Sequence, residues 1–342
     1  METELWQYLK TATKPIVLYG MGNGADKIIN VLNEKGIRFQ GVFASDGFVR
    51  DKLFHGHKIS SYSQLKAKFG DMIVLLCFGS SLPDVIENIL KIASEQELYA
   101  PEVAVIGGGL FDYSFLKENA ESLRFVYNRL ADDASRRTFE NILKYKLSGK
   151  IGYLLDCQVD EAEPYSSFLK LSNERFLDLG AYNGDTVLSF TKNCPNYDSI
   201  LAVEPDKKTF KKLLSNTEGI KNLTVVNACI SDKCETVSFK MLGGRNSVLG
   251  DGKDQIEAVT VDSLGFNPTY IKMDVEGEEV AAITGAKQTI FDNKPKMLIS
   301  AYHRTDDFIT IPKAVFDIRD DYKLYIRHFK YLPAWDTNFY FI

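Results

Sequence analysis

The sequence predicts an α/β protein built from two α/β domains and a helical connector. Two segments carry this prediction, residues 16–35 and residues 175–190, because each passes from an apolar strand through a glycine-containing turn into an amphipathic helix. A chain of 342 residues with 45% hydrophobic side chains has enough apolar material for two cores. The domain boundaries that we predict are residues 1–109, 110–172 and 173–342.

The second of these segments has the features of a ligand-binding turn. Phe176, Leu177 and Leu179 are the apolar strand residues, and Gly180 and Gly184 let the backbone bend tightly. The helix that follows begins at the bend, so its N-terminal N–H groups face it. We therefore expect a small molecule to lie there against bare backbone.

Acidic residues at two strand ends narrow the identity of that molecule. Asp178 lies inside the turn, where its charge would repel the pyrophosphate of a dinucleotide. A second strand, residues 199–203, leads into Glu204, which lies 20 positions after Gly184 and is placed to accept both hydroxyls of a ribose. An aspartate for a cationic amino-acid head, a glycine bend and a ribose-binding glutamate together fit S-adenosylmethionine.

Further strands are expected to complete this domain. The expected strands are residues 223–230, 270–274 and 296–301, a hairpin of residues 236–241 and 256–261, and two final strands at residues 322–328 and 338–342. Asp274 ends one of them, and Tyr302 and His303 follow another, which brings these side chains to one sheet edge. The hairpin loop, residues 243–247, is predicted to lie near the acceptor.

Four motifs in this half of the chain resemble the FkbM-type methyltransferases in order and spacing. They are Asp178-Leu-Gly-Ala-Tyr-Asn-Gly-Asp-Thr186, Val203-Glu-Pro-Asp206, Ile271-Lys-Met-Asp-Val-Glu-Gly-Glu278 and Ala301-Tyr-His303. The resemblance implies a class I methyltransferase sheet of seven strands with the last one antiparallel. It also implies S-adenosylmethionine as donor and an acceptor hydroxyl on a saccharide or polyketide-like compound. The implied cofactor contacts are Asp178, Gly180, Ala181, Tyr182, Gly184, Asp185, Thr186, Glu204, Pro205, Asn227, Ala228 and Asp274.

Methyl transfer to a hydroxyl requires a group that accepts the hydroxyl proton. We predict that His303 removes it as the oxygen attacks in line, and that Asp274 orients or charge-stabilises His303. Cofactor binding itself needs no metal. An alternative is that Asp274, Glu276 and His303 hold one Mg2+ that lowers the pKa of the hydroxyl. Glu278 and Glu279 lie in a first helical turn, where the macrodipole alone favours acidic residues.

The first domain offers rival functions. Gly20-Met-Gly-Asn-Gly-Ala25 follows the strand at residues 16–19, and Asp46 lies 21 positions after Ala25, as in a dinucleotide fingerprint. With further strands at residues 39–44, 72–78 and 103–106, the pattern is similar to the Rossmann-like nucleotide-sugar-binding domains of bacterial sugar-modifying acetyltransferases. The nucleotide contacts would then be Gly20, Gly22, Gly24 and Asp46.

Two alternatives stay open beside that resemblance. One is an NAD-dependent oxidoreductase, in which Tyr62 and Lys66 would imitate a Tyr-x-x-x-Lys pair, although a plain helix start explains the two residues better. The other is a non-catalytic binding or assembly protein. In both alternatives, residues 173–342 would not determine the function of the protein.

Composition bounds the partners. A net charge of −5 and a pI near 5.6 disfavour nucleic acid and leave a small-molecule acceptor, a saccharide or nucleotide sugar, as the expected partner. Five cysteines without a Cys-x-x-Cys pair indicate reduced thiols and a cytoplasmic location. No apolar run reaches the ~18 residues of a membrane span. The sequence does not indicate the oligomeric state.

Overall fold

The computed structural model describes residues 2–45, 47, 52–240, 248–249 and 254–342, which fall into two compact units. The first unit comprises Met1–Ala120, Arg136–Val159 and His328–Asp336, and the second comprises Glu121–Ser135, Asp160–Arg327 and Thr337–Ile342. The boundaries at residues 109 and 172 remain predictions. Within the described residues, none of the helices combines the length and the apolar character needed to cross a bilayer. The five cysteines are free thiols, four of them buried and Cys234 exposed.

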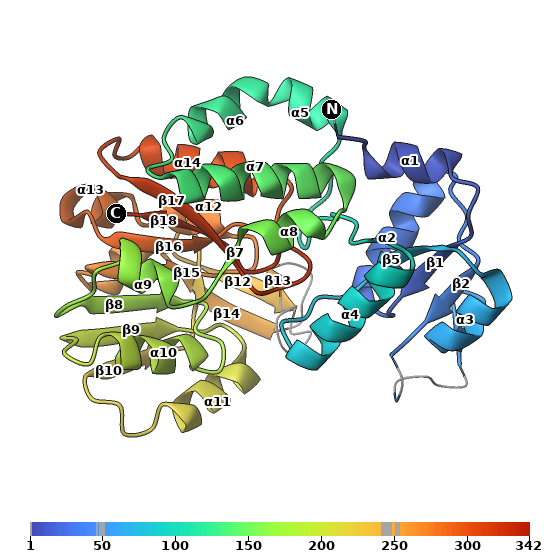
Figure 1. Ribbon diagram of the computed structural model, residues 1–342. Coiled ribbons are helices and arrows are strands. Elements are labelled where there is room, and N and C mark those ends of the chain that lie inside the picture. The colour runs from blue at the N-terminus through green and yellow to red at the C-terminus, as the bar shows by residue number, and fades with distance from the viewer. Residues whose placement is uncertain (1, 46, 48–51, 241–247, 250–253) are drawn as a thin grey trace. The chain divides into compact units, whose positions relative to one another are not determined.

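The first unit contains a sheet whose described strands follow the order β3-β4-β2-β1-β5-β6 (Figure 1). The strands are β1 Ile16–Tyr19, β2 Gly41–Phe43, β3 Leu53–Phe54, β4 His57–Ser60, β5 Ile73–Leu76 and β6 Glu97–Tyr99. All neighbours pair in parallel except β3 and β4. The helices of this unit are α1 Leu5–Thr11, α2 Asn23–Glu34, α3 Tyr62–Phe69, α4 Pro83–Glu95, α5 Tyr113–Glu118 and α8 Gly152–Cys157.

One predicted strand of this unit is wrong. Residues 103–106 form no strand, and the last parallel position is taken by β6, which pairs with β5. The continuous apolar run at residues 103–106 suggested a strand, but the carbonyls of Ala104 and Val105 accept hydrogen bonds from the Lys27 ammonium instead. A side chain that folds back onto the backbone competes with sheet pairing, and sequence periodicity does not reveal it.

The glycine loop after β1 is shaped by packing within the unit. A Cβ on Gly24 would lie 2.3 Å from the carbonyl oxygen of Cys77, and one on Gly20 would lie 2.6 Å from the Phe78 ring. These two glycines are required whether or not a ligand binds. Asp46 lies outside the described residues, so the nucleotide contact remains a prediction.

The rival Tyr62 and Lys66 pair begins α3, as the helix-start explanation requires. Ser61 caps the helix and forms a capping box with Gln64. The Tyr62 hydroxyl and the Lys66 ammonium both bind the Glu95 carboxylate, at 2.9 and 2.7 Å. The two side chains are therefore explained by local structure.

The described residues form a large sheet of eight strands in the order β10-β9-β8-β15-β16-β18-β17-β7. These strands are β7 Gln158–Val159, β8 Arg175–Leu179, β9 Ser199–Val203, β10 Leu223–Val226, β15 Tyr270–Met273, β16 Lys296–Ser300, β17 Leu324–Phe329 and β18 Thr337–Phe341. From β10 to β16 the pairing is parallel, and β18 runs antiparallel to β16 as predicted. The sequence predicted seven strands for this sheet and missed β7. That strand has only two residues, which is too short to show the periodicity from which a strand is predicted.

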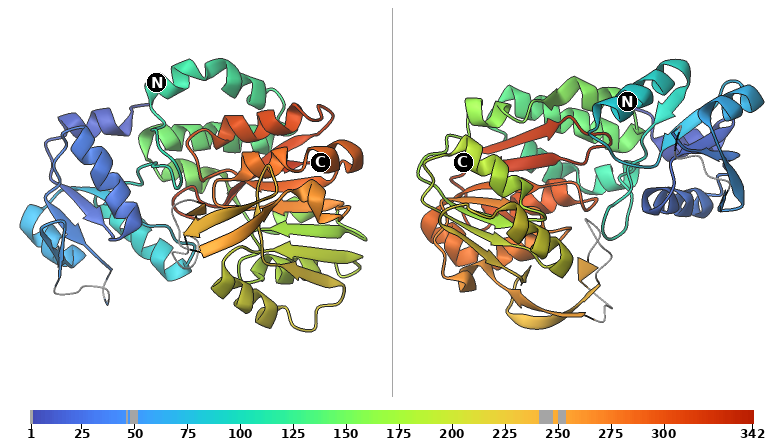
Figure 2. Two further views of the ribbon diagram at one scale, coloured as in Figure 1. Left: turned by 180° about the vertical axis from the view of Figure 1, so that it is seen from behind. Right: turned by 90° about the horizontal axis from the view of Figure 1, so that it is seen from below.

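Helices connect these strands, and a smaller sheet of the second unit follows β10. The helices are α6 Ala120–Tyr127, α7 Asp133–Ser148, α9 Glu163–Ser167, α10 Asp185–Asn193, α11 Lys207–Asn216, α12 Glu279–Thr284, α13 Lys287–Asn293 and α14 Asp307–Phe316, with the 3-10 turn η1 Val261–Leu264. The small sheet orders its described strands β11-β14-β12-β13, seen in yellow to orange in Figure 2. Its strands are β11 Cys229–Ile230, β12 Glu235–Lys240, β13 Val248–Leu249 and β14 Asp254–Val259.

The expected hairpin is confirmed, since β12 pairs antiparallel with β14. Its loop at residues 243–247 lies outside the described residues.

The core beneath the large sheet is aromatic: Phe176 stacks on Phe190 at 4.2 Å and on Tyr270 at 5.0 Å between ring centroids. Each such buried ring contributes about 1.5–3 kcal/mol, which holds β8 and β15 rigidly side by side.

Candidate active site

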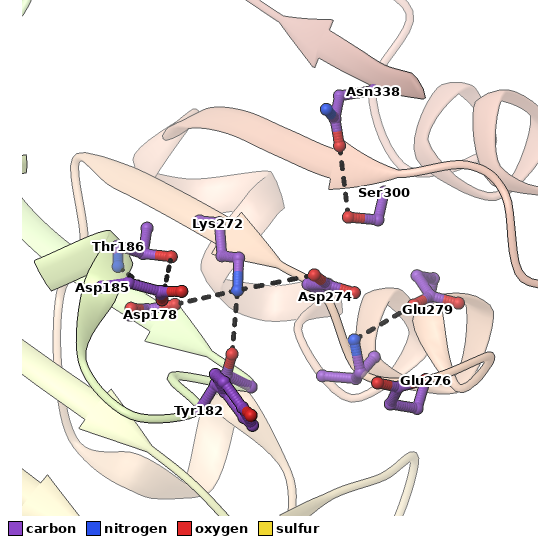
Figure 3. Close-up of polar contacts among 12 residues, drawn as sticks. Asp178, Tyr182, Asp185, Thr186, Lys272, Asp274, Glu276, Glu279, Ser300 and Asn338 are labelled. Atoms are coloured by element: carbon purple, nitrogen blue, oxygen red, sulfur yellow. Dashed lines mark hydrogen bonds and ion pairs between the residues drawn. The ribbon is translucent and has the colours of Figure 1, made fainter. Parts of the chain in front are cut away.

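The carboxyl ends of the parallel strands gather the polar residues of the second unit at one edge, where ligands bind in open α/β sheets (Figure 3). Asp178 on β8 and Lys272 on β15 are register partners. Asp274 follows β15 directly, and Glu204 follows β9. Parallel topology thus brings together side chains that lie up to about a hundred positions apart.

The turn after β8 admits only glycine at its two key positions. Gly180 has φ +77°, and a Cβ there would lie 1.8 Å from the carbonyl oxygen of Asp274. Gly184 has φ +90°, and its Cβ would meet the Thr217 methyl at 2.7 Å. The N–H groups of Gly180 and Ala181 both donate to the Val203 carbonyl at 3.0 Å. The turn is therefore fixed before any ligand enters.

Asp178 and Lys272 form a buried ion pair that the sequence predictions missed. The Lys272 Nζ lies 3.4 Å from Asp178 Oδ1 and 4.0 Å from Asp274 Oδ2, and it donates to the Gly180 carbonyl at 2.8 Å. Burial raises the pKa of Asp178 to about 6, against the pull of Lys272. Burial alone would lower the pKa of Lys272, but the charges of Asp178, Asp274 and Asp185 raise it, so Lys272 is a cation. The sequence does contain one sign of this ion pair, because Lys272 is a charged residue within an otherwise apolar strand.

Glu204 holds the turn in shape from the neighbouring strand. Its Oε2 accepts from the Tyr182 N–H at 2.9 Å, and its Oε1 accepts from the Asp206 N–H at 2.8 Å. Burial raises its pKa to about 7, although those two N–H groups oppose the shift. A carboxylate has about four lone-pair sites, so these bonds leave acceptor capacity for ribose hydroxyls.

The other predicted cofactor residues lie around this glutamate. Asn227 donates through its Nδ2 to the carbonyls of Glu204 and Pro205, at 2.8 and 3.0 Å, which leaves its Oδ1 rather than its amide N–H groups for an adenine edge. Ala228 is buried beside it. Tyr182 adopts φ +46°, and Asp185 accepts from the Thr186 N–H at 2.8 Å in the first turn of α10.

His303 lies among three carboxylates. Its Nδ1 is 3.0 Å from Glu279 Oε1, and its Nε2 is 3.4 Å from Asp274 Oδ1 and 3.6 Å from Glu276 Oε2. Asp274 also accepts from the Tyr302 hydroxyl, at 3.2 and 3.3 Å. We name His303, Asp274, Glu276 and Glu279 the histidine cluster.

The surroundings of His303 are buried and acidic, and its predicted role as general base stays a prediction. The residue is only 1% exposed, whereas the Asp274 side chain is 30% exposed. Burial lowers the pKa of His303, but Glu279, Asp274 and Glu276 outweigh burial and raise it to about 10. Glu279, which was assigned only to the helix dipole, is the nearest partner of His303, so Asp274 is not its sole orienting residue.

Comparison with known proteins decides the identity of the second unit. Residues 178–333 match the model of the methyltransferase FkbM domain. This segment is an FkbM methyltransferase domain. It contains the edge described above, including the glycine turn, the Asp178 and Lys272 pair and the histidine cluster. The chain is therefore an S-adenosylmethionine-dependent methyltransferase.

A solved structure that matches over most of the chain shares this fold. The chain is similar to methyltransferase FkbM from Methylobacillus flagellatus KT, with 23% identity, 96% of this chain and 90% of that chain covered, and a TM-score of 0.71. Precorrin-6y C5,15-methyltransferase from Geobacter metallireducens GS-15 is 14% identical, with 53% and 83% covered and a TM-score of 0.35.

Fibrillarin from Aeropyrum pernix, in complex with natively bound S-adenosyl-L-methionine, is 14% identical, with 51% and 70% covered and a TM-score of 0.32. No curated protein matches the sequence.

Proposed function

We propose that this methyltransferase methylates a hydroxyl group of a small acceptor, a saccharide or a nucleotide sugar. The observation that carries the proposal is the Asp274 carboxylate, which is 30% exposed at the strand edge next to the cofactor turn. A hydroxyl donates a hydrogen bond to a carboxylate, whereas an acceptor without a proton would gain nothing from it. The buried acids beside it then serve the cofactor.

The fit of the cofactor rests on Asp178. Both of its carboxylate oxygens are buried and accept no hydrogen bond within the described part of the chain. Such a carboxylate favours a cationic hydrogen-bond donor, and the amino-acid end of S-adenosylmethionine provides an ammonium. Glu204 would accept the ribose hydroxyls, and Asn227 and Ala228 would contact adenine. When bound, the cofactor supplies an electrophilic methyl group on a sulfonium.

The protein positions the acceptor hydroxyl and provides the group that accepts its proton. The acceptor hydroxyl loses its proton as its oxygen bonds to the methyl carbon, and Asp274 is the exposed carboxylate at that place. Tyr302 donates to Asp274 and fixes its orientation. In this proposal His303 is a positioning residue behind Asp274, because its burial keeps it away from any acceptor.

Glu204 provides a test of the cofactor assignment. Glu204→Gln retains a hydrogen-bond acceptor and the side-chain volume but loses the charge. We expect it to weaken S-adenosylhomocysteine binding by about tenfold or more, because hydrogen bonds to a charged group contribute ~1.5–3 kcal/mol. Calorimetry on the full chain measures this effect. Equal affinity in the variant and the parent would remove Glu204 from the cofactor site.

The raised pKa of Glu204 predicts a pH dependence. Its folded pKa of about 7 means that the carboxylate form dominates at pH 8 and the neutral form at pH 5.5. Since the carboxylate is the better acceptor for ribose hydroxyls, S-adenosylhomocysteine affinity should rise by about tenfold from pH 5.5 to pH 8. The Glu204→Gln variant should show a flatter profile, and an equally steep one would assign the dependence to another group.

The ligand-free protein should show the opposite trend. The folded pKa of Glu204 lies above its ordinary value of 4.5, so the folded state binds more protons than the unfolded state between about pH 4.5 and 7. The contribution of Glu204 to stability therefore decreases as the pH rises through that window. The two opposite slopes separate an effect on binding from an effect on folding.

A further inference from the structure

We propose that the histidine cluster is a divalent-cation site, with His303 Nε2 and the carboxylates of Asp274 and Glu276 as ligands and Glu279 as the residue that orients His303. The site would take an ion that accepts one imidazole and two carboxylates, such as Mn2+. Binding of the ion does not depend on the proposed methyl transfer.

The distances between the donor atoms suit a shared ion. His303 Nε2 lies 3.4 Å from Asp274 Oδ1 and 3.6 Å from Glu276 Oε2. Ligands bound at ~2.1 Å with angles between 90° and tetrahedral are separated by about 3.0–3.5 Å. His303 Nε2 therefore lies close to the spacing of a coordination sphere from each of the two carboxylate oxygens, although it is too far from either for a good hydrogen bond.

The opposite side of the imidazole is fixed. Glu279 Oε1 lies 3.0 Å from His303 Nδ1 and also accepts from the N–H groups of Val275 and Gly277, at 3.1 and 3.3 Å. His303 and Glu279 are each 1% exposed. A carboxylate on one ring nitrogen that directs the other nitrogen towards a metal is the usual arrangement of metal-binding histidines.

The Nε2 nitrogen of His303 is a buried polar atom that an ion could satisfy. The Nε2 atom of His303 is buried and makes no hydrogen bond within the described residues, whereas Nδ1 faces Glu279 at 3.0 Å. Leaving a buried polar atom unsatisfied costs about 1–3 kcal/mol, and an ion bound at Nε2 would remove that cost. This burial distinguishes the cluster from a solvated group of acidic side chains.

The carboxylate side of the cluster is open. The side chains of Asp274 and Glu276 are 30% and 28% exposed, and Figure 3 shows both at the same strand edge as Asp178 and Lys272. An ion held there keeps positions for water or for an acceptor oxygen, whose pKa it would lower. The nitrogen ligand favours Mn2+ over Mg2+, because affinity for imidazole rises along the first-row metals.

The experiment titrates Mn2+ into the full chain after treatment with a chelator, without cofactor or acceptor. Free Mn2+ is followed by electron paramagnetic resonance. We expect one ion per chain in the parent, and affinity about tenfold weaker or worse in Glu276→Gln and in His303→Gln. The matched control is Glu278→Gln, which removes a neighbouring acid that pairs with Arg304 at 3.1 Å, and it should bind as the parent does.

The outcomes separate the proposal from its rivals. Binding lost in Glu276→Gln but kept in Glu278→Gln supports the site. No bound ion in the parent, or the same affinity in all four proteins, overturns it. If His303→Gln does not fold, as judged by circular dichroism, Glu276→Gln decides alone, because Glu276 is partly exposed. Since no methyl transfer is measured, a failure of the proposed function would leave this result unchanged.

Discussion

Replacement of Lys272 by methionine is expected to lower the free energy of unfolding by about 3 kcal/mol, because it leaves a buried carboxylate without its cation. Asp178 is fully buried, and it forms an ion pair with Lys272 at 3.4 Å. Methionine retains most of the aliphatic stem, so loss of packing contributes little. Urea unfolding at pH 8 measures the effect, since Asp178, with a pKa of about 6, is ionised there.

The double variant Asp178→Asn with Lys272→Met identifies the cause. If the uncompensated charge is responsible, the neutral asparagine should recover most of the lost stability. Lys212→Met is the control for a lysine exposed on α11, and it should change stability by no more than about 0.5 kcal/mol. A double variant that is less stable than Lys272→Met alone would contradict the charge argument.

The parts of the fold that could be predicted are those in which local sequence and topology agree. Phe176, Leu177 and Leu179 followed by two glycines specify a strand, a turn and a helix within a few residues. Once a parallel sheet is predicted, every strand end must lie at one edge, so Asp178, Glu204 and Asp274 had to converge. That these three side chains lie close together could therefore be predicted from the sheet topology alone.

The parts that could not be predicted depend on contacts between distant residues. Lys272 pairs with Asp178 only because β8 and β15 are in register. Glu279 contacts His303 because its side chain turns into the core, which the charge pattern of a first helical turn does not show. The two-residue strand β7 forms because β17 offers it a partner. In each case a tertiary contact outweighs the local pattern.

The burial of His303 has the same origin. A histidine after a strand end suggests a base at the edge, and the strand end is indeed where β16 places it. However, the His303 and Arg304 N–H groups both donate to Asp307 at 2.8 Å, which ties the backbone down ahead of α14. The ring is therefore buried, and in our proposal the exposed Asp274, rather than His303, accepts the proton.

Replacement of Asp274 by asparagine should therefore lower kcat by about 100-fold or more, since it removes the carboxylate that we assign to the acceptor proton. The amide keeps the volume and can still accept from the Tyr302 hydroxyl. Turnover is measured with labelled methyl donor against a screen of saccharides and nucleotide sugars. Glu278→Gln serves as control and should keep kcat within about twofold of the parent.

Cofactor affinity tells which role Asp274 has. The sequence also counted Asp274 among the cofactor contacts, and its side chain lies 4.0 Å from Lys272 Nζ. We expect the variant to bind S-adenosylhomocysteine within about threefold of the parent, because Asp178 and Glu204 remain in place. Unchanged turnover would remove Asp274 from the reaction. Lost cofactor affinity with normal kcat at saturation would make Asp274 a cofactor ligand, and the proton acceptor would then have to be another group at the edge.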